Sequence, residues 1–141
     1  LYSELLNLME AGKADFTHTF KSLKAILIKE DTSIFLNNFI GLDEDNQRAL
    51  NKWLGDWKKF MKENNESKAK AIDLLSSSNP EFIMRNHLVE KSIVKATEDD
   101  FSDFEILSDL LINPYEIKEN HEAFYKAPTN KEVVHKTFCG T

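Results

Sequence analysis

Cys139 is the only cysteine of the 141-residue chain, and it stands two residues before the last one, in the ending TFCGT. A single thiol cannot form a disulfide within this chain. It can stay free, be modified, or pair with a cysteine of another segment. One cysteine also excludes a disulfide framework and favours a reducing compartment. Cys139 is therefore the first candidate for chemistry, in a redox or tethering role.

The other residue types that perform chemistry do not form a recognisable constellation. His18, His87, His121 and His135 lack the spacing of metal ligands, and neither HExxH nor CxxC occurs. The isolated glycines form no phosphate-binding loop. An acidic run at residues 98–105 lacks the central glycine and the ligand spacing of an EF-hand, which favours a solvated charged surface. We expect no catalytic, cofactor-binding or metal-binding residue in this chain.

Arg85 and Asn86 follow an apolar stretch, and they leave three interpretations open. The guanidinium of Arg85 can pair with a carboxylate as a structural element, bind a phosphate, or contact another domain. We take Arg85 and Asn86 as candidates for interdomain docking.

Composition describes an ordinary folded protein. Hydrophobic residues make up 41% and charged residues 30%, and the net charge is −6. A nucleic-acid partner would require a basic surface, which this mixed charge pattern does not provide. No apolar run has the length of a membrane span. We therefore expect neither nucleic-acid nor membrane binding.

Apolar residues recur at spacings of three and four along most of the chain, the period of an α-helix. We predict one all-α domain over residues 1–141, an irregular bundle of about six helices with an extended tail after Tyr115. Gly12 is expected to end the first helix, and Asp15 and Asp43 to begin the second and the longest. Trp53 and Trp57 are expected in the core.

Two further helix starts are predicted from capping patterns. Asn79 followed by Pro80 indicates a helix over residues 79–96, with the asparagine as N-cap and the proline in the first turn. Ser102 and Glu105 have the spacing of a capping box.

Four segments resemble, in order, the C-terminal region of the selenoprotein O (SelO, YdiU) family. NPEFIMRNHL at 79–88 is similar to the family pattern NPxxxxRNxL, and ADFTHTF at 14–20 to AD[FY]TxTF. DFS at 100–102, with the leucines and NPY up to position 115, resembles GDFS…L…PY/PF. The ending FCGT resembles the family ending with Cys or selenocysteine. The chain departs from the pattern at Asp99, where the family has glycine, and at Ala127, where a Pro-Pro pair is common.

The resemblance implies the activity of a longer protein. Family members are pseudokinase-like enzymes that transfer AMP, or UMP in bacterial members, from a nucleoside triphosphate to Ser, Thr or Tyr hydroxyls of proteins, with Mg²⁺ or Mn²⁺. Their nucleotide and metal residues lie in an upstream kinase-like domain, and only Cys139 carries over as a functional position. We therefore expect a C-terminal fragment of a cytoplasmic bacterial protein, inert by itself, whose partners are its own kinase-like domain and protein substrates. The alternative is a stand-alone helical scaffold that binds a partner protein.

Overall fold

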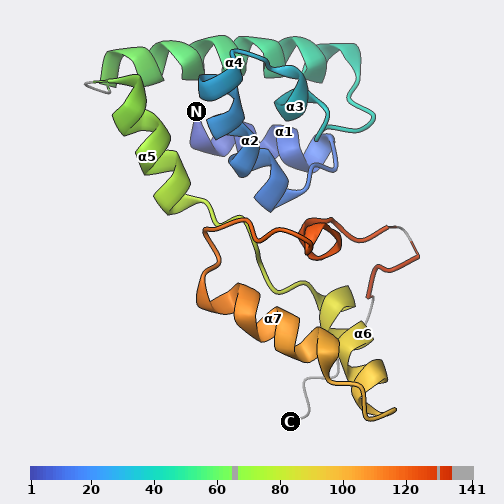
Figure 1. Ribbon diagram of the computed structural model, residues 1–141. Helices are drawn as coiled ribbons and strands as arrows, with labels where there is room; N and C mark the ends of the chain where they lie inside the picture. The colour runs from blue at the N-terminus through green and yellow to red at the C-terminus, as the bar shows by residue number, and fades with distance from the viewer. Residues whose placement is uncertain (65–66, 130, 135–141) are drawn as a thin grey trace. The chain divides into compact units, whose positions relative to one another are not determined.

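The computed structural model describes residues 1–64, 67–129 and 131–134 (Figure 1). These residues form seven α-helices and one short 3₁₀ helix, η1, and contain no strand, which confirms the predicted all-α class. The chain divides into two compact units, unit 1 over Leu1–Asn79 and unit 2 over Pro80–Thr141. Unit 1 holds α1 (Tyr2–Ala11), α2 (Phe16–Lys29), α3 (Ser33–Leu36), α4 (Glu44–Asn64) and α5 (Lys68–Ser78). Unit 2 holds α6 (Asn86–Ala96), α7 (Ser102–Ile112) and η1 (Glu122–Tyr125).

Helix ends in unit 1 are set by local side chains, as the sequence predicts. The Asp15 carboxylate accepts a hydrogen bond from His18 N at 2.8 Å and caps α2. Asp43 accepts one from Asn46 N at 2.7 Å at the start of α4. Gly12 ends α1, and a Cβ at this position would lie 2.9 Å from side-chain atoms of Phe39 and Leu42. A side chain at this turn would therefore force the Phe39 and Leu42 side chains to move.

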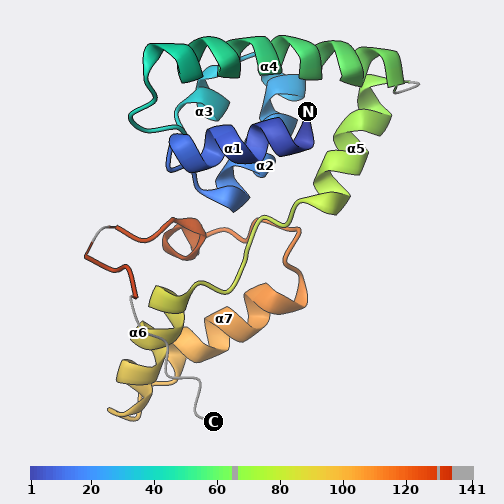
Figure 2. The same ribbon diagram turned by 180° about the vertical axis from the view of Figure 1, so that it is seen from behind.

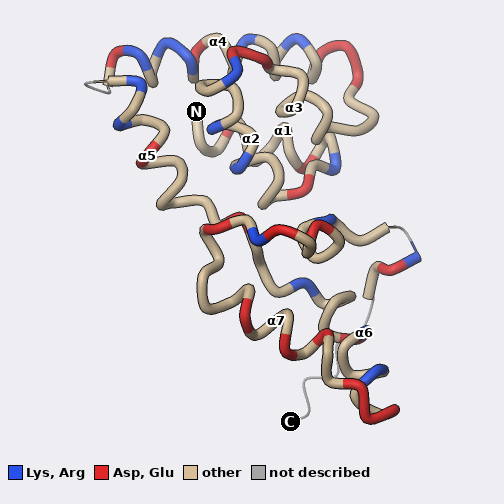
Figure 3. The backbone as a smooth tube through the Cα atoms, viewed as in Figure 1, with Lys and Arg blue, Asp and Glu red and all other residues tan. Residues whose placement is uncertain are grey.

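The core of unit 1 is built around α4, which runs along the unit with α1 beside it in both views (Figures 1 and 2). Trp53 and Trp57 are buried, as predicted, and their rings stack with centroids 6.3 Å apart. Phe35 is fully buried and stacks on Trp53 at 5.7 Å. Lysines and acidic residues alternate along α4 between the buried positions, as the colours of Figure 3 show, and they are exposed. One face of α4 is therefore apolar and buried, and the rest of its surface is charged and exposed to solvent.

Unit 2 has a smaller core. Among its described residues the buried apolar side chains are Phe82, Leu88, Leu107 and Leu110. Phe82 meets the ring of Tyr125 edge to face, with centroids 6.1 Å apart. Tyr125 comes from η1, which interrupts the tail that was predicted to be extended. Packing of the aromatic rings therefore holds the segment after α7 against the start of the unit.

Two predicted helix starts are wrong. Residues 79–96 do not form one helix: Asn79 closes α5, with its Nδ2 donating to Leu75 O at 2.9 Å, and α6 begins only at Asn86. The backbone N–H groups of Glu81 and Phe82 donate instead to Pro114 O, at 2.8 and 2.9 Å.

The capping box is not formed either. Ser102 is the first residue of α7, and its own N–H donates to the Asp100 carboxylate at 3.0 Å. The serine that was expected to act as a cap is therefore itself held by the residue two positions before it.

Candidate functional site

The docking candidates Arg85 and Asn86 stand at the junction between the irregular segment that begins unit 2 and α6. Arg85 has extended backbone angles and is the N-cap residue of α6, and its carbonyl accepts from Leu88 N at 2.9 Å and Val89 N at 3.1 Å. The Arg85 side chain is half-buried and Asn86 is exposed. The segment that leads to α6 is anchored by the hydrogen bonds of Glu81 N and Phe82 N to Pro114 O.

A small cavity of about 260 Å³ opens beside this junction. Its walls come from α6, η1 and the segment that follows η1. The lining side chains with polar or charged groups are His87, Lys91, Lys126, Thr129 and Glu132.

Two side chains that line this cavity, His87 and Glu132, have shifted pKa values. Burial lowers the pKa of His87 below its usual 6.5, and the positive charges of Arg85 and Lys91 act in the same direction while Glu132 opposes them. The pKa of Glu132 lies below its usual value, chiefly because the Thr129 hydroxyl and then its N–H donate to the carboxylate. At neutral pH the cavity therefore presents a neutral imidazole near an ionised carboxylate. Sequence reasoning did not bring His87 and Glu132 together, since they lie far apart along the chain.

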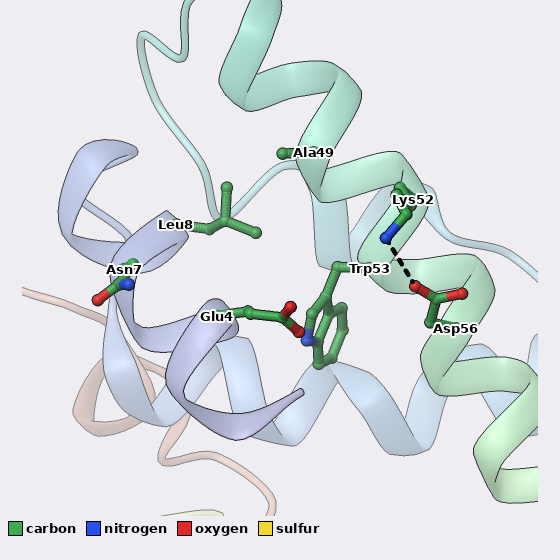
Figure 4. Close-up of a pocket in the computed structure, with 7 residues that line it drawn as sticks. All are labelled: Glu4, Asn7, Leu8, Ala49, Lys52, Trp53 and Asp56. Atoms are coloured by element: carbon green, nitrogen blue, oxygen red, sulfur yellow. Dashed lines mark ion pairs between the residues drawn. The ribbon is translucent and has the colours of Figure 1, made fainter.

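Unit 1 has a hollow of its own, of about 230 Å³, between α1 and α4 (Figure 4). Trp53 forms an apolar wall, and its indole Nε1 donates to Leu1 O at 2.7 Å. Lys52 and Asp56 pair at 3.4 Å along α4 and largely neutralise each other. Glu4, Asn7, Leu8 and Ala49 complete the lining.

Three further expectations from the sequence concern Cys139, metal binding and membrane spanning. Cys139 lies outside the described residues. Within the described ranges, no group of three or more His, Cys, Asp or Glu side chains is arranged to hold a metal ion. In the same part of the chain, none of the helices combines the length and the hydrophobicity needed to span a bilayer.

Both units thus belong to the class of all-α protein regions, each with a small cavity, and unit 2 has a docking candidate at a helix start. The sequence profile described as "Protein adenylyltransferase SelO" matches residues 1–112. The chain therefore belongs to the SelO family, which confirms the resemblance seen in the motifs.

Individual relatives agree with the profile. The chain is 41% identical over 142 residues to the protein nucleotidyltransferase YdiU of Rhizobium meliloti (strain 1021), covering all of this chain and 28% of that protein. The YdiU proteins of Clostridium perfringens (strain SM101 / Type A) and Bacillus thuringiensis subsp. konkukian (strain 97-27) are each 34% identical across the whole chain, which covers 26% and 27% of their lengths. The chain thus spans about a quarter of the relatives it matches. No solved structure matches it.

Proposed function

We propose that the protein containing this chain is a protein nucleotidyltransferase of the SelO/YdiU type, and that this chain is its C-terminal helical region. The supporting observation is that relatives named protein nucleotidyltransferase align with all of the chain at 34–41% identity. The reaction that we propose is the transfer of AMP, or UMP, from a nucleoside triphosphate to Ser, Thr or Tyr hydroxyls of other proteins.

ATP and its divalent ion, Mg²⁺ or Mn²⁺, would be bound outside this chain. The described residues do not fit these groups, because they offer neither a glycine-rich phosphate loop nor a cluster of metal ligands. The part that we assign to this chain is to pack on the kinase-like lobe that carries the nucleotide. Arg85 and Asn86, beside the cavity of unit 2, are our candidates for that contact.

Activity assays test the proposal directly. The full-length protein, incubated with ATP labelled at the α-phosphate and with Mg²⁺ or Mn²⁺, is expected to label acceptor proteins, whereas residues 1–141 alone are not. Calorimetry should give no dissociation constant tighter than about 10 μM for ATP and metal on the chain alone. Tighter binding would place the nucleotide site in this chain. Failure of the full-length protein to label any acceptor would favour the alternative, a helical scaffold without enzymatic activity.

The Arg85→Ala variant tests docking. Its AMP transfer in the full-length protein is expected to fall several-fold, whereas the thermal unfolding midpoint of the isolated chain is expected to fall much less. The matched control is Lys91→Ala, which removes another positive charge from the same helix region. If the isolated chain is destabilised just as severely, Arg85 acts as a local structural residue and the docking role fails.

We further propose that Cys139 is a redox or tethering residue that pairs with a cysteine outside this chain. The chain supplies no second thiol. Disulfide mapping by mass spectrometry, with and without reductant, is expected to find Cys139 bonded under oxidising conditions. A free thiol in both states, together with unchanged AMP transfer by Cys139→Ser, would show that the residue has no redox role.

A further inference from the structure

Helix α7 has apolar side chains on two adjoining faces. Leu107 and Leu110 point into the core of unit 2 and are buried. On the other face Phe101, at the N-cap, is 53% exposed, Phe104 60%, Leu111 44% and Ile112 74%. With 3.6 residues per turn, positions 101, 104, 108, 111 and 112 fall on one stripe about 100° wide. We call Phe101, Phe104, Leu111 and Ile112 the outer stripe of α7.

Nothing within the described part of unit 2 covers the outer stripe. A helix that is apolar on both faces is typical of an element buried between two layers. Contiguous exposed apolar surface of this kind marks an interaction site. Since the core of the unit has only four buried apolar side chains among its described residues, burial of two further phenylalanines by a partner would add substantially to the stability of so small a unit.

Charges around the stripe indicate the chemistry of its partner. Glu105 and Asp109 follow one edge of the stripe, one helical turn apart. The exposed residues Glu98, Asp99 and Asp100 lie just before its first phenylalanine. Lys118 pairs with Asp109, so the positive charge near this edge is already engaged. A complementary surface would have an apolar centre and a basic edge.

We propose that the outer stripe of α7 is covered by the part of the same polypeptide that lies outside these 141 residues. This inference rests on the proposed function, because it assigns the face through which this region packs on the remainder of the enzyme. The relatives contain almost three-quarters of their length beyond the region this chain matches. A permanently apolar face needs a partner that is always present, and a covalently linked domain meets that need through its high effective concentration.

Cysteine accessibility in the full-length protein tests the inference. In a background with native cysteines replaced by serine, Phe104→Cys and Leu111→Cys are expected to react with a maleimide at least tenfold more slowly than Glu119→Cys and Glu90→Cys. Both controls replace exposed acidic residues of the same unit. Hydroxyl-radical footprinting of the unmodified protein gives a second measurement that needs no variant. Phe101, Phe104 and Leu111 should be oxidised far more slowly than their intrinsic reactivities predict; oxidation at the intrinsic rate, or maleimide reaction as fast as at the two control cysteines, would overturn the inference.

Cross-linking identifies what covers the stripe. With p-benzoylphenylalanine in place of Phe104, irradiation is expected to link position 104 to peptides outside residues 1–141. Links to residues 1–79 or to a second copy of the chain would overturn the proposed partner. If the links lie outside this chain but the protein does not transfer a nucleotide, the packing face stands and the proposed function alone fails.

Discussion

Lys95 and Asp103 form an ion pair that joins α6 to α7, with Nζ 2.7 Å from Oδ1. The Asp103 side chain is almost fully buried, while that of Lys95 is about one-third exposed. The hydrogen bond to Asp103 is the main cause that raises the pKa of Lys95 above its usual 10.5. Asp103 belongs to the acidic run at residues 98–105 that we predicted from the sequence to be a solvated surface, and Lys95 lies just before that run. One member of that run is thus a buried structural group.

Removing this carboxylate should destabilise unit 2. Asp103→Ala is expected to lower the free energy of unfolding by about 1 kcal/mol, since a charged hydrogen bond is lost at a partly exposed site. The control Glu90→Ala, on the exposed face of α6, should change it by less than about 0.5 kcal/mol. Urea unfolding followed by circular dichroism measures both.

The same pair predicts a dependence on alkaline pH. Because the folded-state pKa of Lys95 is raised, its contribution is fully present below 10.5 and is lost as the pH rises through the folded value. The difference in stability between wild type and Asp103→Ala should therefore be constant near neutral pH and shrink in strong alkali. A difference that instead disappears on going from pH 7 to pH 9 would contradict this assignment.

Asp100 should titrate below its usual 3.8, because the Ser102 side chain and then the Ser102 N–H donate to its carboxylate. A depressed folded-state pKa means stability that is present above 3.8 and lost as the pH falls through the folded value. Ser102→Ala is expected to move the pKa of Asp100 back toward 3.8 in a carbon-detected NMR titration. The control Ser108→Ala, further along α7, should leave it unchanged.

The tryptophan stack should dominate the stability of unit 1. Trp57→Ala removes a buried ring from α4 and is expected to cost about 3–5 kcal/mol. Phe60→Ala changes a half-exposed ring of the same helix and should cost less than about 1 kcal/mol. Equal losses, measured by chemical denaturation, would show that Trp57 is not packed as the structure has it.

Asn79→Ala should loosen α5 and leave α6 intact. The lost hydrogen bond from Nδ2 to Leu75 O is expected to cost about 1 kcal/mol. Hydrogen exchange should quicken in the last turn of α5, while amides at the start of α6 keep their protection. Faster exchange confined to α6 would instead support the continuous helix predicted from the sequence.

The sequence by itself determined the all-α class, the caps at Asp15 and Asp43 and the burial of Trp53 and Trp57. These features depend on interactions within a few residues, or on a helical repeat of apolar side chains. The ordered motifs also identified the family, because a resemblance needs residues and their order but no coordinates.

Tertiary structure decided the features that depend on distant partners. Asn79 has the side chain to cap a helix, and Pro80 fits a first turn, yet the following N–H groups are taken by Pro114 O from beyond α7. These two hydrogen bonds, together with the packing of Phe82 against Tyr125, keep the backbone out of the helical conformation until α6 begins after Arg85. The lining of one cavity by both His87 and Glu132, and the ion pair of Lys95 with Asp103, likewise bring separate elements together. A local pattern shows which hydrogen bonds a residue is able to make, and only the folded chain determines which partner is within reach.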